Sequence, residues 1–128
     1  MARKIINTDR APAAIGPYSQ ANVVNGFLYT AGQIPLDPVT MEVVGEDAAG
    51  QTLQAMQNAE AILAEAGYKL ADVVKATIFI RDMGEFANIN EVYKDFFPAD
   101  PPARSVVEVS RLPKDVLVEI ELIAYRSQ

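Results

Sequence analysis

Between residues 101 and 126 the sequence reads PPARSVVEVSRLPKDVLVEIELIAYR, two apolar segments joined by a turn. Both segments are rich in β-branched residues, which favour β-strands. We predict strands over residues 103–109 and 116–125. Arg104 lies in the first segment, and Glu119 and Glu121 lie in the second. The fold and the function therefore depend on which side of a sheet these charged groups occupy.

Residues 116–125 alternate between two chemical characters, as the two sides of a strand do. One side is entirely apolar and consists of Val116, Val118, Ile120, Leu122 and Ala124. The other side mixes apolar and acidic groups and consists of Leu117, Glu119, Glu121, Ile123 and Tyr125. A strand predicted over 73–80 divides similarly, with Val74, Ala76, Ile78 and Ile80 opposite Val73, Lys75, Thr77 and Phe79. The apolar sides should pack on helices, whereas the mixed sides predict burial against other copies of the chain.

The remaining segments complete an α+β domain. Short strands are predicted over residues 4–7, 21–24 and 27–31, with Asn25-Gly26 as a two-residue hairpin turn. Helices are predicted over residues 51–66 and 85–97 from the spacing of their apolar residues. No internal repeat or linker interrupts the 128 residues, so we predict a single domain over 1–128. The element order favours a mixed sheet with two helices on one face.

The composition excludes several classes of enzyme. The chain has no histidine and no cysteine, so a Ser-His-Asp triad, a thiolate nucleophile and an ordinary zinc site cannot form. The 17 acidic residues outnumber the 11 basic ones, and the net charge of −6 disfavours a nucleic-acid partner. The first residues lack the apolar core of a secretory signal, and no apolar run reaches membrane-spanning length. We therefore expect a cytoplasmic protein without a membrane partner.

Two charged residues are the strongest candidates for chemistry. Arg104 starts a strand, where its planar guanidinium could bind a ligand carboxylate through two hydrogen bonds. The alternative is a structural ion pair with Glu108 or with a glutamate of a neighbouring strand. Glu119 stands on a mostly apolar strand face, where loss of water raises the pKa of a carboxyl and suits a general base or acid. The alternative is an ion pair with Lys75 or Arg104 at a subunit interface, and the pattern alone makes the same case for Glu121.

Five segments closely resemble the reactive-intermediate deaminase family, also called RidA or YjgF. They are APAAIGPYSQ (11–20), TAGQIP (30–35), VVKATIFIRDM (73–83), FANINEVYKDFF (86–97) and PPARSVVEVSRLPKDVLVEIELIA (101–124). Together they cover nearly the whole chain. The resemblance implies a chorismate-mutase-like fold and a homotrimer in which three sheets form a central barrel with the helices outside. It also implies three ligand sites, in the clefts between subunits.

The resemblance further implies an activity. Members of this family hydrolyse 2-imino acids, such as 2-iminobutanoate and 2-iminopropanoate, to 2-oxo acids and ammonia, without a metal or organic cofactor. Arg104 matches the family's arginine for the substrate carboxylate, and Glu119 matches the glutamate that activates water. Tyr18, Gly32 and Asn90 match pocket-lining positions. Tyr18 would come from the neighbouring subunit's side of the cleft, and the backbone of Gly32 would lie close to the ligand.

The chain departs from the family pattern at two positions. Many members have Arg-Ser-Cys where this chain has Arg104-Ser105-Val106, so the backbone carbonyl of Val106 is what remains there to contact water. Many have Thr-Ser-Gly-Gln where this chain has Thr30-Ala31-Gly32-Gln33, so one hydroxyl near the pocket is lost. These differences affect the expected substrate range and leave the reaction class unchanged.

Two other functions stay open from the sequence. Some family members are described as endoribonucleases or translation inhibitors, but a metal-free ribonuclease usually uses histidine or a basic cleft. This chain has no histidine, and its basic residues are scattered. The other alternative is a regulatory protein that binds small carboxylates, which Arg104 alone would support. Glu119 distinguishes that alternative from an enzyme, because a binding protein has no need of a carboxylate that activates water.

Overall fold

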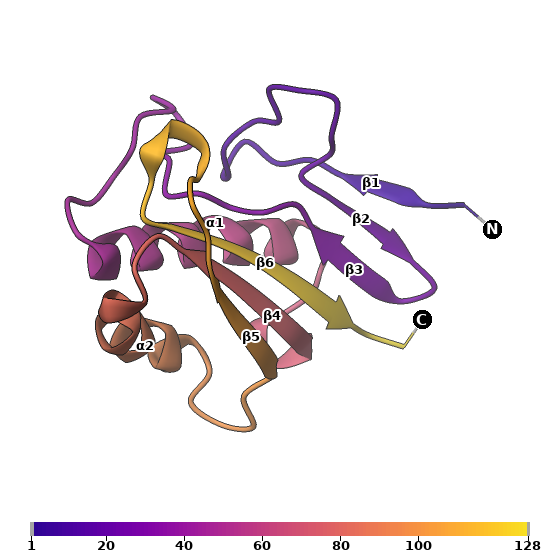
Figure 1. The fold of residues 1–128 in the computed structure, drawn as a ribbon. Coiled ribbons are helices and arrows are strands. Elements are labelled where there is room, and N and C mark those ends of the chain that lie inside the picture. The colour runs from indigo at the N-terminus through magenta and orange to yellow at the C-terminus, as the bar shows by residue number, and fades with distance from the viewer. Residues whose placement is uncertain (1, 128) are drawn as a thin grey trace.

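The computed structural model describes residues 2–127 and has the element order that the sequence predicts (Figure 1). Within these residues the elements are β1 (Lys4–Ile6), β2 (Ala21–Val24), β3 (Phe27–Thr30), α1 (Ala48–Glu65), β4 (Val73–Ile80), α2 (Phe86–Tyr93), β5 (Ala103–Glu108) and β6 (Val118–Tyr125). All six strands join one sheet in the order β1-β2-β3-β6-β4-β5. Strands β4 and β5 run parallel, whereas the other neighbouring pairs are antiparallel. The sheet is therefore mixed, and the predicted α+β class is confirmed.

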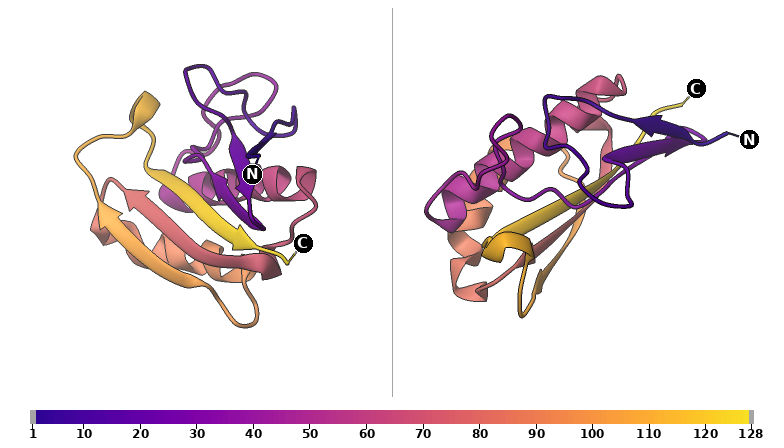
Figure 2. Two further views of the ribbon diagram at one scale, coloured as in Figure 1. Left: turned by 90° about the vertical axis from the view of Figure 1, so that its right-hand side faces the viewer. Right: turned by 90° about the horizontal axis from the view of Figure 1, so that it is seen from above.

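Both helices lie on one side of the sheet, as predicted (Figure 2). The side of β6 that faces them is apolar throughout and is fully buried. Helix α1 contributes the other half of this core through Ala55, Met56, Ala59, Ile62 and Leu63. Removal of these side chains from water is the main contribution to the stability of such a layer. Among residues 2–127, no helix has both the length and the apolar character needed to cross a bilayer.

The hairpin between β2 and β3 has the geometry that its sequence predicts. Asn25 and Gly26 have φ angles of 53° and 83°, and the Asn-Gly pair is favoured where both central residues of a turn need positive φ. The carbonyl of Gly26 accepts hydrogen bonds from the Tyr68 hydroxyl (2.8 Å) and the Arg126 amide (3.0 Å). The turn is thereby attached to the loop after α1 and to the end of β6.

Helix α1 begins three residues earlier than the sequence predicts, at Ala48 instead of Gln51. Asp47 caps this end, and its side chain accepts a hydrogen bond from the Gly50 amide (2.8 Å). The segment 48–50 consists of two alanines and a glycine, so it carries no spacing of large apolar residues that would indicate a helix. At the other end Gly67 has a φ of 81°, which suits the residue after a helix, as predicted.

Helix α2 is shorter than predicted. Residues 86–93 are α-helical, and the flanking segments Met83–Glu85 and Lys94–Phe96 are 3₁₀ turns. The side chain of Asp82 caps the first of these turns by accepting a hydrogen bond from the Gly84 amide (2.8 Å). Short 3₁₀ turns are common at helix ends, and apolar spacing does not separate them from α-helix. The predicted helix over 85–97 therefore merged three short elements.

A register shift near the start of β4 reverses the predicted faces of Val73 and Val74. The pairing with β6 is irregular between Val73 and Lys75, so Val73 is buried whereas Val74 is exposed. The predicted sides of these two valines are therefore reversed, while the rest of the strand alternates as predicted. A bulge inverts the alternation locally, and it leaves no signal in a run of valines.

Strand β6 begins at Val118, two residues later than predicted. A 3₁₀ turn over Pro113–Asp115 precedes it, in which Lys114 and Asp115 both have positive φ (56° and 55°). The amide of Leu117 donates to the side-chain oxygen of Gln51 (2.7 Å) and not to a strand neighbour. The turn thus delays entry into the sheet, although Val116 is already buried.

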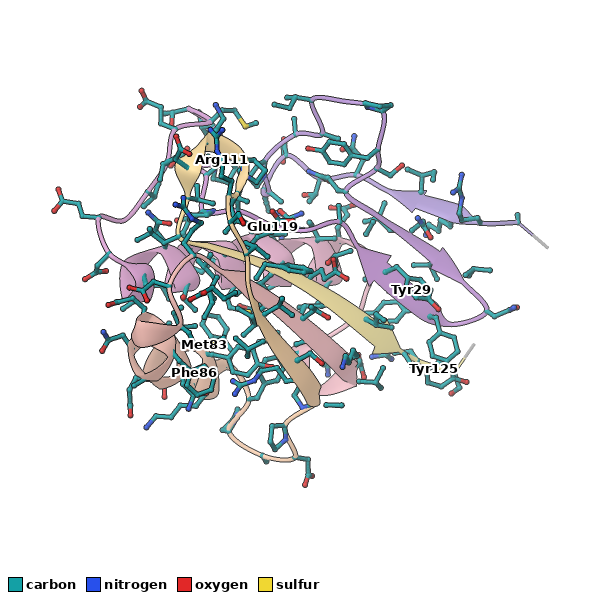
Figure 3. All side chains as sticks on the ribbon, in the orientation of Figure 1. Tyr29, Met83, Phe86, Arg111, Glu119 and Tyr125 are labelled. Carbon is teal, nitrogen blue, oxygen red and sulfur yellow. The ribbon has the colours of Figure 1, made fainter. Side chains whose placement is uncertain are left out.

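The side of the sheet away from the helices is partly apolar, as predicted. Glu119, Glu121 and Ile123 are partly buried, whereas Tyr125 is exposed. The ring of Tyr125 lies 4.7 Å from that of Phe27, and Figure 3 shows Tyr29 on the neighbouring strand. We call Phe27, Tyr29 and Tyr125 the aromatic cluster. Burial of this side against other copies of the chain stays a prediction.

Candidate active site

The chain leaves β3 through a bulge that brings the next loop onto β6. Tyr29 pairs with Ile123, and Gln33 pairs with Ile120 through two backbone hydrogen bonds of 2.7 and 3.0 Å. From Tyr29 to Gln33 the chain advances four residues, whereas β6 advances only three between their partners Ile123 and Ile120. One extra residue on one strand defines a β-bulge, and bulges are frequent beside active sites. This one places Gly32 over the start of β6.

Gly32 lies directly against the carboxyl of Glu119. A β-carbon at position 32 would stand 2.7 Å from Cδ of Glu119 and would overlap one of the carboxyl oxygens. Such distances do not occur between a Cβ and its neighbours, so a larger residue at position 32 would require the Glu119 side chain or the backbone beside it to move. The close approach of the two groups explains the glycine, without any need for an unusual backbone conformation.

Glu119 projects from the side of β6 that faces away from the helices. Burial raises the pKa of its carboxyl above the ordinary value of 4.5, and the nearby Glu121 carboxylate raises it further. Within residues 2–127, no hydrogen bond or ion pair joins this carboxyl to Lys75 or Arg104. The amine of Lys75 bonds the hydroxyl of Ser105 instead (3.0 Å). The predicted pairing of Glu119 with one of these groups across a subunit interface involves a second chain and stays a prediction.

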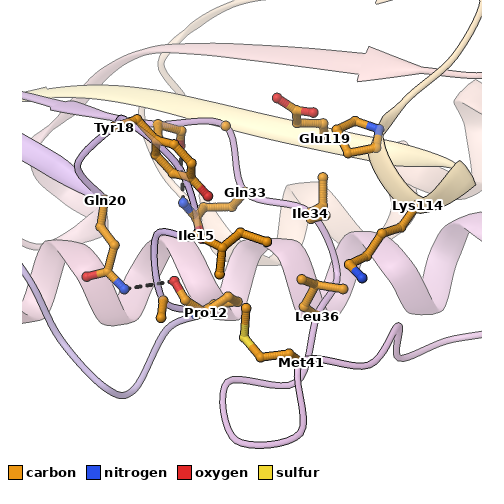
Figure 4. A pocket seen from close by; sticks show the side chains of 14 residues that line it. Pro12, Ile15, Tyr18, Gln20, Gln33, Ile34, Leu36, Met41, Lys114 and Glu119 are labelled. Atoms are coloured by element: carbon orange, nitrogen blue, oxygen red, sulfur yellow. Dashed lines mark hydrogen bonds between the residues drawn. The ribbon is translucent and has the colours of Figure 1, made fainter.

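Glu119 and Gly32 line an apolar cavity of about 440 Å³ together with Tyr18 (Figure 4). We call it the Glu119 cavity. Most of its remaining wall is apolar and includes Pro12, Ile15, Ile34, Leu36 and Met41. Apolar walls around a few polar groups are typical of small-molecule sites.

A buried glutamine fixes the loop that carries Tyr18. The side-chain nitrogen of Gln20 donates to three backbone carbonyls, those of Thr8 (2.9 Å), Ala11 (3.3 Å) and Pro12 (2.8 Å). Its side-chain oxygen accepts a hydrogen bond from the Thr8 amide (2.7 Å). The sequence marks this stretch only as a loop beside a pocket, because the partners of Gln20 are irregular backbone without a pattern.

Arg104 lines a second cavity, of about 430 Å³, beside α2. We call it the Arg104 cavity. Nη1 of Arg104 donates a hydrogen bond of 2.7 Å to Oδ1 of Asn90. Its Cζ lies 5.3 Å from the ring centroid of Phe86 and 5.0 Å from that of Tyr93. Burial raises the pKa of the Tyr93 hydroxyl, and the guanidinium opposes this shift. The guanidinium is therefore held by one amide and two aromatic rings.

No acidic side chain within residues 2–127 forms an ion pair with Arg104. The predicted partner Glu108 instead accepts a hydrogen bond from the Met83 amide (2.7 Å), so that alternative is wrong. The positive charge of Arg104 is thus available to an anionic ligand. The same part of the chain contains no group of three or more acidic side chains that could hold a metal ion.

Arg104 and Glu119 lie on opposite faces of the sheet. Arg104 is in register with Ala76 and Leu122, both buried against the helices. Glu119 belongs to the other alternating set of β6 and points away from the helices. The predicted site residues divide accordingly, with Tyr18, Gly32 and Glu119 in one cavity and Asn90 and Arg104 in the other. A single chain does not bring the two sets together.

Val106 lies outside both cavities, whereas two rings that the sequence does not mark as site residues lie beside Arg104. Val106 lies on β5 and packs partly against the core, outside the lining of both cavities, so its water contact stays a prediction. The apolar spacing of the predicted helix over 85–97 places Phe86 and Tyr93 on its core-facing side and gives no indication of a site. Their signal is the spacing from Asn90 by four and three positions, which puts all three on one face of α2.

Comparisons with known proteins agree with this architecture. A family model described as Endoribonuclease L-PSP matches residues 8–126. A RutC family protein of Pyrococcus abyssi is 54% identical over 126 residues, which cover 98% of this chain and 99% of that protein. A Salmonella typhimurium protein named 2-iminobutanoate/2-iminopropanoate deaminase is 50% identical over 126 residues, which cover 96% and 98%. The crystal structure of E. coli TdcF with bound serine has a TM-score of 0.93 at 50% identity and covers 97% of this chain and 99% of that one. The chain therefore belongs to the Endoribonuclease L-PSP family, which is the RidA/YjgF family that the sequence motifs indicate.

Proposed function

We propose that the protein hydrolyses small 2-imino acids, such as 2-iminobutanoate and 2-iminopropanoate, to 2-oxo acids and ammonia. The observation that carries the proposal is that Arg104 has no acidic partner among residues 2–127, while Glu119 is a partly buried carboxyl whose pKa is raised. The first group suits recognition of a carboxylate, and the second suits proton transfer to and from water. The deaminase name of the Salmonella typhimurium relative supports the same reaction.

We further propose that the active site forms between subunits of a homotrimer. The Glu119 cavity of one subunit would face the Arg104 cavity of its neighbour, because a single chain holds these groups on opposite sheet faces. The Glu119 side would supply Tyr18 and the backbone of Gly32. The Arg104 side would supply Asn90 and the carbonyl of Val106. The aromatic cluster and the mixed face of β6 would then be buried between sheets.

In this cleft the guanidinium of Arg104 binds the carboxylate of the protonated imine. Glu119 takes a proton from water while the water oxygen attacks the imine carbon, which gives a carbinolamine. Glu119 then protonates the nitrogen, and the C–N bond breaks as the hydroxyl becomes the carbonyl of the 2-oxo acid. The hydroxyl proton leaves with ammonia as ammonium. One iminium ion and one water are consumed in each cycle, and Glu119 returns to its carboxylate form.

The first prediction tests the role of Glu119 with a matched pair of variants. Glu119→Gln keeps the shape of the side chain but cannot take a proton, so imine turnover is expected to fall by roughly 10²–10⁴. Binding of 2-oxobutanoate through Arg104 is expected to persist. Glu121→Gln is the control, because Glu121 lies on the same sheet face but outside both cavities. Imine decay after a coupled threonine dehydratase and calorimetric binding measure the two properties. Loss of turnover in Glu121→Gln with full turnover in Glu119→Gln would contradict the role of Glu119 and assign it to Glu121.

A second candidate function is binding of small carboxylates without catalysis. The uncompensated charge of Arg104 favours it, as does the serine bound to E. coli TdcF, since serine carries a carboxylate. The same assay separates the two functions. Binding of 2-oxobutanoate by the wild-type protein, with imine decay no faster than in buffer, would establish the binder and overturn the enzyme.

A further inference from the structure

Three residues on one face of α2 surround the guanidinium of Arg104. Phe86 and Tyr93 present their rings to it at 5.3 and 5.0 Å from Cζ, within the range of about 6 Å for a cation–π interaction. Asn90 lies between them along the helix and accepts the 2.7 Å hydrogen bond from Nη1. All three partners are uncharged, so they hold the guanidinium without neutralising it.

This mode of support differs from that of an arginine in an ion pair. A carboxylate partner would offset the charge and occupy several of the N–H donors, whereas Asn90 engages one nitrogen. A free arginine side chain also has about 2 kcal/mol of rotamer entropy, which ligand binding would have to overcome. Rings on the guanidinium remove much of that freedom before a ligand arrives.

We propose that Phe86 and Tyr93 form an aromatic clamp that orients the guanidinium of Arg104 for a ligand carboxylate. The ligand class rests on the proposed function, but the clamp itself is a feature of the free chain. Both rings are positioning residues, because they contact Arg104 and act on the ligand through it. Tyr93 is buried, whereas Phe86 is 37% exposed. Phe86 can therefore be replaced with little loss of core packing, and it is the better residue to test.

Binding and kinetics give the first test. Phe86→Leu removes the ring, so the Kd for 2-oxobutanoate and the KM for the imine are expected to rise about threefold to thirtyfold. The kcat should change by less than about twofold, because the carboxylate is bound in both the ground state and the transition state. Phe86→Tyr restores a ring face and should recover most of the lost affinity. Phe96→Leu is the matched control, since Phe96 lines a separate hollow with Leu53 and Val92.

Side-chain NMR of the ligand-free protein gives the second test. The guanidinium resonances of Arg104, identified by their loss in Arg104→Lys, should show a ring-current shift that Phe86→Leu reduces and Phe96→Leu leaves in place. If Phe86→Leu keeps both the shift and the wild-type Kd, the clamp is wrong. If the shift responds as expected but the wild-type protein neither binds 2-oxobutanoate nor hydrolyses imine, the clamp stands and the proposed function is wrong.

Discussion

Folding disfavours the anionic form of the Glu119 carboxyl, because burial and the Glu121 charge both raise its pKa. The folded protein therefore holds this proton more tightly than the unfolded chain does. The resulting contribution to the free energy of unfolding is fully present below the ordinary pKa of 4.5 and is lost as pH rises through the folded pKa. The property that makes Glu119 a stronger base at neutral pH thus lowers the stability of the fold.

This linkage gives a prediction for stability. Glu119→Gln is neutral at every pH, so it should have a higher free energy of unfolding than the wild-type protein at about pH 8. Near pH 4 the wild-type carboxyl is mostly protonated in both states, and the difference should shrink. Urea denaturation at the two pH values measures the effect. An advantage of Glu119→Gln that grows toward acid would contradict the raised pKa.

The contact between Gly32 and Glu119 gives a second residue-scale prediction. Gly32→Ala forces the carboxyl or the bulge to move, because the new Cβ would stand 2.7 Å from Cδ of Glu119. Imine hydrolysis is expected to fall about tenfold to a hundredfold, since small displacements of a catalytic group have effects of this size. Gly67→Ala is the control, because a Cβ there meets no atom within 4 Å and Gly67 lies outside the lining of both cavities, so kcat/KM should stay unchanged. Full kcat/KM in Gly32→Ala would show that the position of the carboxyl is not critical.

The individual charged residues were predictable to different degrees. Glu119 and its side of the strand followed from the alternation of β6, because a regular strand fixes the face of each residue. The sequence singles out Arg104 as a candidate, but it does not predict which face of the sheet the side chain occupies. That face depends on the parallel register of β4 and β5 and on the packing of α2, which are contacts between segments distant in the sequence. The packing of Phe86 and Tyr93 against Arg104 could not be predicted for the same reason, since α2 and β5 are distant in the sequence.

At the scale of elements, the bulge after β3 depends on one side chain. The hydroxyl of Thr30 accepts a hydrogen bond from the Leu122 amide (3.0 Å), at a point where the β3 backbone has moved away from β6. Thr30 and Leu122 are both buried, so this amide has no access to water in the folded chain. The side chain thus takes the place of a backbone acceptor and lets the bulge form without an unpaired donor.

Thr30→Val therefore tests how the bulge is stabilised. The shape of the side chain is kept, but the Leu122 amide is left buried without its acceptor, and the expected cost is about 1–3 kcal/mol of unfolding free energy. Thr40→Val is the control, because the Thr40 hydroxyl accepts its hydrogen bond from the backbone amide of Glu42 at an exposed site. Its effect should stay within about 0.5 kcal/mol. Equal stability of the two variants in urea denaturation would show that another group satisfies the amide.

Regular elements were predictable and their irregular ends were not. The apolar stripe of α1 and the Asn-Gly hairpin carry local signals, and both lie where expected. The early start of α1, the reversed valines of β4 and the 3₁₀ turn before β6 depend on caps and register shifts. A bulge in a valine-rich strand changes no residue type, so neither composition nor periodicity reports it.

At the scale of the whole molecule, the sheet separates two cavities that hold different candidate residues. Tyr18, Gly32 and Glu119 line one cavity, together with Lys114, and Arg104 lines the other, where no acidic side chain of residues 2–127 forms an ion pair with it. The proposed water-activating carboxyl and the proposed carboxylate-binding guanidinium thus lie in different cavities of one chain. The exposed aromatic cluster on the mixed sheet face adds apolar area that a second copy could cover. These features together favour a site shared by two chains.

Mixing of two inactive variants tests this assembly directly. Arg104→Ala and Glu119→Gln should each be nearly inactive, and each should have a mass about three times the 13.9 kDa chain mass by light scattering. When the two are unfolded together and refolded at equal amounts, about a quarter of the clefts should pair an intact Arg104 with an intact Glu119 from different subunits. Activity should then recover to about a quarter of the wild-type value, provided that the subunits mix at random. Separately refolded variants, combined afterwards, are the control and should stay inactive until subunits exchange. Trimers that mix but regain no activity would mean that both residues act within one chain, and a monomeric mass would remove the proposed cleft altogether.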